Sequence, residues 1–570
     1  MEEKELRAYF LLAALFSAGV LLTACASLAP HGSGPFDRQF QKDLDQTPVP
    51  MPKETAYSGQ WIRAEGLVVR PALRVIDLPA HAQTMGEWLG ITDPVEAQNI
   101  NAWDEVPDST WFTNRIGKEN PTDDKLGDPV GKPPDMSGKW TIIRGKTDGI
   151  TAGFTILDAR GEMYFIKFDP PGFEGLVTGA ETISSLILHW AGYNVPDNYL
   201  MRIPLDIFAL SKDAKVLGEY GVKRQMTVAD LDKILDRLVL DEECKIRVLA
   251  SRALEGRPLG PFTMGGKRAD DPNDRFPHQH RRELRGYHIV SAWLNNPDVA
   301  TKNTLDMYVG EPGKGFVRHN VLDFGSSLGS AGNRIKHPKD GYALAVGHGD
   351  ILHDFFTLGW TTDYWEENKG TDFTSIGTFE WENFDPLRWA PWWSNPTYET
   401  LTHRDAFWAT RLIMRFSRQQ IKAIVEAAQY PEEGAAEYMV TALTKRREKM
   451  AATWFRLVTP LDHFSVEQGP VLSFVDLAVL YNIGDTSQRT YRASVASTLA
   501  EFSREDFEFH TEDETGRVAL LPPGPSLGPR RAHFKVHLTV HEGGETVGDG
   551  MDVYVYCSGD SACVISGLER

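Results

Sequence analysis

Residues 316–330 read FVRHNVLDFGSSLGS, a strand-like run that ends in a small polar turn. The apolar positions precede Asp323, and Phe324 and Gly325 follow it directly. A carboxylate at the end of a strand is a hard oxygen ligand of the kind that Mg²⁺ prefers. An Asp-Phe-Gly sequence by itself is also a common turn. Its interpretation therefore depends on which residue types accompany it elsewhere in the chain.

A second polar loop stands upstream, NNPDVATKNTLDMY, residues 295–308. Asp298 is followed four and five residues later by Lys302 and Asn303. Taken alone, this spacing also fits a polar loop in which Asp298 caps a turn. An acid, a cation and an amide within six residues nevertheless supply a proton acceptor, a phosphate-binding charge and a metal ligand.

Further upstream, YFIKFD places Lys167 in a strand, and the helical pattern of residues 178–196 places Glu181 near its start. Lys167 alone would be a solvent-facing strand lysine. Thr178 and Glu181 have the spacing of a capping box, and Glu181 could serve as a cap and as a partner for Lys167. A glycine-spaced loop precedes this strand and would let backbone amides approach phosphates. Its residues are Gly145, Lys146, Gly149 and Gly153.

Phosphoryl transfer needs these residue types together. The order and spacing of the set resembles the protein-kinase-like superfamily, most closely its HipA-like branch, whose catalytic loop also reads Asp-x-x-x-Lys-Asn. CotH-like kinases are a further point of comparison, because they work outside the cytoplasm. The resemblance covers residues 138–455 as scattered short motifs.

The resemblance implies ATP and Mg²⁺ as cofactors and assigns a role to each residue. Lys167 and Glu181 would form the ion pair that meets the phosphates, and Asp298 would be the catalytic Asp, assisted by Lys302. Asn303 and Asp323 would bind magnesium. The stretch SRALEGRPL, residues 251–259, resembles a kinase hinge and would bring Glu255 beside the nucleotide.

The chain departs from the superfamily pattern in several places. Asn295-Asn296-Pro297 stand where His-Arg often precede the catalytic Asp, and the glycine loop carries Lys146. The Ala-Pro-Glu signature of protein kinases is missing after Asp323. These departures bear on recognition of a protein substrate more than on nucleotide binding.

The hydrophobic periodicity predicts an α+β fold. Between residues 138 and 460, strand patterns come first and helical patterns follow, which indicates a two-lobed kinase-like domain with a strand-rich N-lobe and a helical C-lobe. Thr227 and Ser417 are expected helix N-caps. Residues 461–570 return to two-residue alternation and predict a separate β-sandwich. Residues 61–137 are expected to be an N-terminal extension that packs on the kinase-like domain.

The N-terminus resembles a bacterial lipoprotein signal. Residues 8–22 are apolar but short for a membrane span, and Leu22-Thr23-Ala24-Cys25 resembles a lipobox. Residues 1–24 would then be removed, Cys25 lipidated, and residues 25–60 left as a flexible tether. Ala26 and Ser27 after the cysteine are typical of lipoproteins of the outer membrane. We expect a protein anchored in the cell envelope, at the periplasmic face of the outer membrane or the cell surface.

The remaining cysteines are few. Cys557 and Cys563 flank a Ser-Gly-Asp turn between two strand-like runs, and either a hairpin disulfide or two free thiols fits this pattern. Cys244 is expected to be buried. The run WENFDPLRWAPWW, residues 381–393, holds four tryptophans that would form either packed core or a sugar-stacking platform.

Composition limits the classes of partner. The chain has 570 residues, 41% of them hydrophobic, and a formal net charge of -19. No long basic run is present, so nucleic acid is not an expected partner. Two functions remain: an exported kinase-like enzyme that acts on an unknown envelope protein or glycan, and a non-catalytic pseudokinase-type scaffold or glycan- or peptide-binding module.

The anchoring hypothesis predicts a diacylglyceryl group on Cys25, because the thiol of the lipobox cysteine is the lipidated atom. Mass spectrometry of the membrane-bound protein should detect it, and Cys25→Ala should leave the protein uncleaved or released from the membrane. A soluble protein that retains Met1 would contradict the hypothesis.

Overall fold

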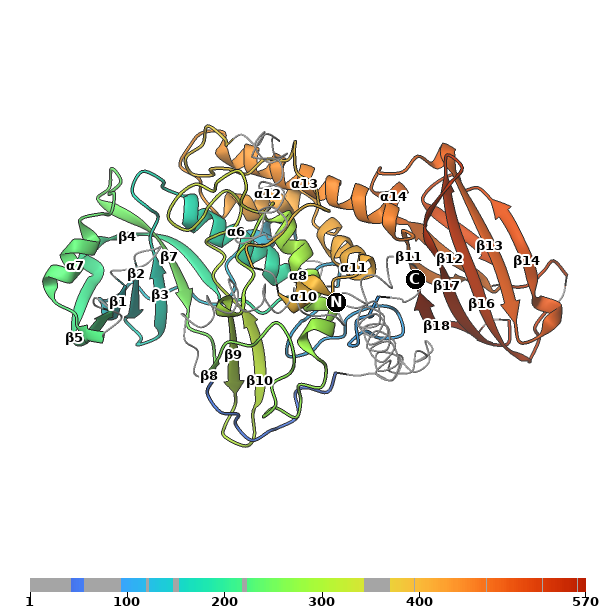
Figure 1. Cartoon of the computed structure of the whole chain (residues 1–570), viewed down its shortest axis with the longest axis horizontal. Helices are drawn as coiled ribbons and strands as arrows, with labels where there is room; N and C mark the ends of the chain where they lie inside the picture. The colour runs from blue at the N-terminus through green and yellow to red at the C-terminus, as the bar shows by residue number, and fades with distance from the viewer. Residues whose placement is uncertain are drawn as a thin grey trace, which may run out of the picture.

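The computed structural model describes residues 43–55, 94–118, 122–146, 153–217, 223–342, 370–393, 395–467, 469–524, 526–560 and 562–570. The fold is a mixed α+β fold, as the sequence predicts. A strand-rich part lies at one end, helices occupy the centre, and two further sheets lie at the other end (Figure 1). The expected signal peptide and Cys25 lie outside the described residues. Among the described helices, none combines the length and apolar composition that a membrane crossing requires.

The strand-rich part is one seven-stranded sheet with the order β4-β7-β3-β2-β1-β5-β6. All neighbouring strands are antiparallel except β1 and β5. The strands are β1 (Trp140–Lys146), β2 (Gly153–Leu157), β3 (Met163–Lys167), β4 (Asn198–Pro204), β5 (Phe208–Leu217), β6 (Lys223–Gln225) and β7 (Lys245–Arg252).

Alternation along β3 explains which way Lys167 faces. Tyr164 and Ile166 are fully buried in the cluster that packs on one face of the sheet, whereas Phe165 is exposed on the other. Because successive strand side chains point to opposite faces, Lys167 shares the face of Phe165. Two helices accompany this sheet, α6 (Leu176–Ala191) and α7 (Val228–Leu235). The expected Thr227 cap of α7 is confirmed.

A three-stranded sheet of order β10-β9-β8 follows. Its strands are β8 (Arg257–Gly260), β9 (Thr304–Val309) and β10 (Phe316–Val321). Residues 253–256 therefore connect the last strand of the large sheet to this smaller sheet. The stretch expected to be a hinge lies at this junction.

Among the described central helices, α8 and α11 are largely buried, whereas α10, α12 and α13 bury only part of their residues. The bounds are α8 (Arg282–Trp293), α10 (Pro396–Glu399), α11 (His403–Met414), α12 (Arg418–Glu426) and α13 (Ala435–Leu457). The Ser417 cap of α12 is confirmed and forms a capping box with Gln420. Every residue of α8 is buried, and α10, α11 and α13 pack against it.

Short 3-10 turns also occur among the described residues. They are η2 (Asp123–Gly127), η3 (Leu205–Ile207), η5 (His278–His280), η6 (Thr301–Asn303), η8 (Thr486–Gln488) and η9 (Ala500–Phe502).

The described part of the N-terminal extension packs into this helical core. Trp111 and Phe112 belong to the same apolar cluster as α8. Arg282 of α8 donates to Asp104 of the extension and, at 3.1 Å, to Asp405 of α11. All three side chains are buried, so their charges are compensated by one another rather than by water. The segment around residues 104–112 is thus part of the helical core.

Residues 461–570 form two antiparallel sheets, of order β11-β12-β15 and β14-β13-β16-β17-β18. Side chains of both sheets enter one apolar cluster, among them Phe474 from the first and Phe534 from the second. Their elements are β11 (Leu461–Glu467), β12 (Val471–Asp476), α14 (Leu477–Leu480), β13 (Arg489–Ser497), β14 (Arg504–Phe509), β15 (Thr515–Ala519), β16 (Arg531–Glu542), β17 (Glu545–Ser558) and β18 (Cys563–Glu569).

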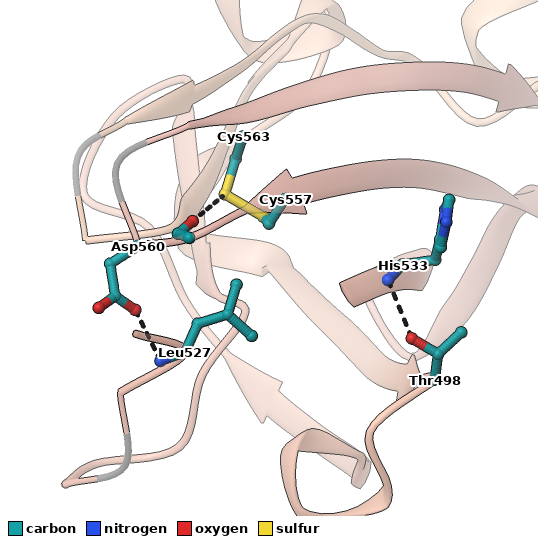
Figure 2. Close-up of a disulfide and its surroundings, with 7 residues drawn as sticks. Thr498, Leu527, His533, Cys557, Asp560 and Cys563 are labelled. Carbon is teal, nitrogen blue, oxygen red and sulfur yellow. Dashed lines mark hydrogen bonds between the residues drawn. A yellow bond between two sulfur atoms is a disulfide. The ribbon is translucent and has the colours of Figure 1, made fainter. Parts of the chain in front are cut away.

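Cys557 and Cys563 are joined by a disulfide between β17 and β18 (Figure 2). The two residues are directly opposite in the strand register. Beside them, Asp560 accepts the N–H of Leu527 at 2.7 Å and so ties the same turn to a neighbouring loop. The expectation for Cys244 was wrong. This residue is exposed, with a φ of 58°, because it lies in a surface turn before β7 in which its N–H donates to the Asp241 carbonyl at 3.0 Å and residues 242–244 are all exposed.

Thiol trapping tests the disulfide. In protein denatured without reductant, an alkylating reagent should label Cys244 and spare Cys557 and Cys563, and prior reduction should add both labels. Cys244 is the internal control, because its thiol has no covalent partner. Labelling of Cys557 before reduction, located by peptide mass spectrometry, would contradict the prediction.

Candidate functional site

The centre of the site is the ammonium group of Lys167, which lies between two carboxylates. Lys167 Nζ is 3.0 Å from Glu181 Oε2 and 2.8 Å from Asp323 Oδ1. Lys167 and Glu181 come from the consecutive elements β3 and α6, 14 residues apart, whereas Asp323 lies in the turn after β10, 156 residues beyond Lys167. The structure therefore brings together three of the residues singled out from the sequence.

The environments of the three groups differ. Glu181 is buried, whereas the side chain of Asp323 is 60% exposed. Burial raises the pKa of Glu181, and Lys167 opposes that rise. Burial also disfavours the charge on Lys167, but the carboxylates of Asp323 and Glu181 outweigh it and raise the lysine pKa above its usual value. Lys167 is therefore a fixed cation with an accessible carboxylate beside it.

The start of α6 shows why Glu181 is free to bind the lysine. The alternative in which Thr178 and Glu181 form a capping box is wrong, because the helix begins earlier, with Gly175 at the N-cap. Asp169 accepts the backbone N–H groups of Gly175, Val177 and Thr178 at 2.8, 2.9 and 2.9 Å. Since Asp169 fulfils the capping role, the Glu181 side chain is directed to Lys167.

The turn at residues 323–325 has two local requirements. Asp323 has a φ of 60°, a left-handed conformation that Asp tolerates better than bulky residues. A Cβ atom on Gly325 would lie 3.1 Å from Val177 and 3.2 Å from Glu181 Oε2. A side chain at Gly325 would thus crowd the carboxylate that holds Lys167. Phe324 is fully buried and anchors the turn.

Asp298 forms a second polar group, held within its own loop. Lys302 Nζ is 2.9 Å from Asp298 Oδ2, and the side-chain nitrogen of Asn303 donates to the Asp298 carbonyl at 2.8 Å. Burial raises the pKa of Asp298, and Lys302 limits the rise. The bond from Asn303 uses its amide nitrogen, and its amide oxygen is the atom that a metal ion would bind.

A backbone hydrogen bond joins the two polar groups. The N–H of Leu322 donates to the carbonyl of Asn303 at 2.9 Å, which continues the pairing of β9 with β10 beyond Thr304 and Val321. Asn303 and Asp323 therefore lie at the same end of this strand pair. Within the described residues no cluster of three His, Cys, Asp or Glu side chains suited to a metal occurs, so a metal here would rely on one carboxylate, one amide and its other ligands.

Two buried basic side chains that the sequence analysis missed support the loop around Asp298. Lys336 donates to the carbonyls of Asn295 and, at 2.7 Å, Leu328. Burial lowers the pKa of Lys336 well below its usual value, so this side chain acts as a hydrogen-bond donor rather than as a fixed charge. Both acceptor residues have positive φ, 44° and 50°. Arg446 of α13 donates to the carbonyls of Ala292 and Trp293, where α8 ends. No sequence signal marks either side chain, because their partners are backbone carbonyls.

The glycine-spaced loop is described only at its ends. Gly153 pairs with Lys167 across β2 and β3, so the β1–β2 hairpin begins beside the lysine. A Cβ atom on Gly153 would lie 2.3 Å from the Ile166 carbonyl, and one on Gly145 would lie 2.6 Å from the sulfur of Met226. Close packing therefore explains why glycine stands at both positions. Gly149 and the side chain of Lys146 lie outside what the structure describes.

Glu255 lies in the turn between β7 and β8, with its side chain 77% exposed and 3.9 Å from Arg318. A surface hollow of about 370 Å³ lies elsewhere, between the N-terminal extension and Arg415. None of the residues that line it belongs to the group around Lys167 or Asp298.

Comparison with known proteins gives little further information. No family model matches the chain, and no curated protein matches it. Among solved structures, the proinflammatory kinase CtkA of Helicobacter pylori is similar over 53% of this chain and 90% of its own, with 12% identity and a TM-score of 0.27. At this score the similarity carries no argument, so the functional interpretation depends on the geometry of the site.

The two hydrogen bonds from Lys336 to the carbonyls of Asn295 and Leu328 lead to a prediction about stability. Lys336→Met should lower the free energy of unfolding by about 1–3 kcal/mol, because two buried carbonyls lose their donor. Chemical denaturation followed by tryptophan fluorescence measures the change. Lys449→Met is the matched control, because Lys449 also donates to two carbonyls but is only half-buried. Equal, small effects of the two substitutions would contradict the assigned role of Lys336.

Proposed function

We propose that this chain is a kinase-like phosphotransferase that binds Mg-ATP and transfers a phosphoryl, or nucleotidyl, group to an acceptor in the cell envelope. The observation that carries the proposal is the position of Lys167, 3.0 Å from the buried Glu181 and 2.8 Å from the exposed Asp323. A buried acid that holds a lysine extended beside an accessible acid is the arrangement that nucleotide phosphates with a metal require.

The residues present fit a magnesium ion. Asp323 offers a solvent-accessible carboxylate, and Asn303 lies at the same end of the β9–β10 pair through the Leu322 hydrogen bond. Magnesium keeps several waters and is commonly bound by one or two protein oxygens beside phosphates, so this small set suffices. When bound, the ion would neutralise phosphate charge. Lys167 would then exchange Asp323 for the phosphates while Glu181 keeps it extended.

Asp298 suits the role of proton acceptor for the attacking hydroxyl. Its burial raises its pKa and so makes the carboxylate a better base than a solvated Asp. Lys302, bound to the same carboxylate, has the charge needed to approach a transferring phosphoryl group. Because Asp298, Lys302 and Asn303 are close in the sequence, one loop would carry the proton acceptor, a phosphate-binding charge and a metal ligand.

A non-catalytic scaffold is the second candidate, and a specific observation favours it. Lys167 neutralises Asp323 directly, and both carboxylate oxygens of Asp298 accept hydrogen bonds, from Lys302 and Trp393. A site whose charges are already matched within the chain can be stable without a nucleotide. Such a module would use its cleft or its C-terminal sheets to bind a glycan or peptide.

The cellular setting is also part of the proposal. We infer lipid anchoring through Cys25, from the lipobox resemblance, and a position at the periplasmic face of the outer membrane or the cell surface. We further propose that the two C-terminal sheets pack as a β-sandwich, supported by the apolar cluster to which both contribute. This domain would contact the envelope partner.

Ligand-induced stabilisation tests nucleotide binding. ATP with Mg²⁺ at 100 times its dissociation constant should stabilise the wild type by roughly 2.7 kcal/mol in a thermal-shift titration. Asp323→Ala should lose the Mg²⁺-dependent part of the shift, because it removes the accessible carboxylate. Asp298→Ala should retain the shift and lower the transfer rate by about 10²- to 10⁴-fold.

The outcomes separate the two candidates. The scaffold hypothesis predicts no nucleotide-dependent shift in the wild type or in any variant. Glu311→Ala is a useful control, because its carboxylate is exposed in the turn between β9 and β10 and pairs only with the neighbouring Lys314, at 3.1 Å, among its described ion pairs. If Asp323→Ala binds Mg-ATP as well as the wild type does, the assignment of the turn at residues 323–325 is wrong.

A further inference from the structure

A tryptophan-rich segment lies along the loop that carries Asp298. The indole N–H of Trp389 donates to Asn295 Oδ1 at 3.2 Å, and the indole N–H of Trp392 donates to Asp340 Oδ1 at 3.0 Å. The backbone N–H of Trp392 donates to the Pro297 carbonyl at 2.7 Å. These contacts fix the register of the segment against the loop, one residue before Asp298.

The next residue in the segment reaches the carboxylate itself. Trp393 Nε1 donates to Asp298 Oδ1 at 3.1 Å, while Lys302 donates to Oδ2 at 2.9 Å. The ammonium of Lys302 also lies 6.0 Å from the centre of the Trp393 ring. The two oxygens of one carboxylate are thus held by donors from two different segments of the chain.

Core packing does not explain Trp393. Trp389, earlier in the same segment, is 4% exposed and belongs to the apolar core, whereas Trp393 is only half-buried. An indole at the edge of the core gains less free energy from burial than one inside it. The Trp393 indole nevertheless donates its single N–H to the buried Asp298 carboxylate. The sugar-stacking alternative does not require that contact either.

We propose that Trp393 is a positioning residue that fixes the orientation of the Asp298 carboxylate for proton transfer. The inference rests on the proposed function of Asp298 and goes beyond it by assigning a residue outside the kinase-like motifs. Donors on both oxygens set the rotation of the carboxylate, and a general base must be held within hydrogen-bond reach of its proton. The indole is a neutral donor, so it orients the carboxylate without adding a second positive charge beside it.

The first experiment compares Trp393→Phe with Trp392→Phe in the full-length protein. Both substitutions remove an indole N–H and keep an aromatic ring, but only the first removes a donor to Asp298. With ATP turnover as the activity, Trp393→Phe should leave Mg-ATP affinity within about twofold and lower the maximal rate by about tenfold. Trp392→Phe should leave both quantities close to their wild-type values.

A second readout needs no turnover. Experimental structures of the wild type, Trp393→Phe and Trp392→Phe show the orientation of the Asp298 carboxylate directly. With the donor to Oδ1 removed, the carboxylate should rotate or occupy more than one orientation in Trp393→Phe, whereas it should keep the wild-type orientation in Trp392→Phe. Benzothienylalanine at position 393, which replaces the N–H by sulfur and keeps the ring size, is the second variant if Trp393→Phe is unstable, and it should give the same result.

The two readouts separate failure of this inference from failure of the proposed function. If the wild type does not turn over ATP but the Asp298 carboxylate changes orientation only in the variants that lack the Trp393 donor, the positioning contact holds and the catalytic proposal fails. If the carboxylate keeps the same orientation in all of these proteins, Trp393 does not control it and the inference is overturned.

Discussion

The ammonium of Lys167 between Glu181 and Asp323 is the constraint on which the arrangement of the site depends. A buried carboxylate such as Glu181 is costly unless it is paired, and the loss of one member of a buried pair leaves an uncompensated charge. Helix α6 must therefore stay docked against the sheet to keep Glu181 beside the lysine. The turn at Asp323 must also stay close, because Gly325 leaves room for Glu181 and little more.

The loop that carries Asp298 depends on a different kind of contact. Here the chain ends a helix and passes through left-handed residues, which leaves backbone carbonyls without helical partners. Buried side-chain donors fill that need: Arg446 donates to the carbonyls of Ala292 and Trp293, and Lys336 donates to those of Asn295 and Leu328. These bonds connect the end of α8 to the segment after Asp323, so the two halves of the site are held in one framework.

The sequence predicts correctly those features that depend on neighbouring residues alone. Thr227 and Ser417 cap their helices, and two-residue alternation in β3 identifies the face of Lys167. The motif residues Lys167, Glu181 and Asp323 come together as their order implies. Glu181 was also given a capping role because Thr178 stands at the right spacing. The competing cap, Asp169, lies six residues before the N-cap residue Gly175.

The sequence could not predict contacts between a side chain and a part of the chain far away in the sequence. Lys336 and Arg446 have no motif, because a carbonyl acceptor exists at every residue. The tryptophans of residues 381–393 were interpreted as core or as a sugar platform, and spacing alone cannot show that Trp393 meets Asp298. The exposure of Cys244 was missed for a similar reason, since it follows from a turn geometry rather than from residue type.

The most direct test of the central claim is an experimental structure of the full-length protein with Mg²⁺ and a non-hydrolysable ATP analogue. The account predicts a metal ion about 2.0–2.1 Å from oxygens of Asp323 and Asn303. It also predicts that Lys167 remains on Glu181 and moves from Asp323 to the phosphates. A nucleotide bound away from Lys167, or a Lys167–Asp323 pair that persists beside bound nucleotide, would contradict the claim.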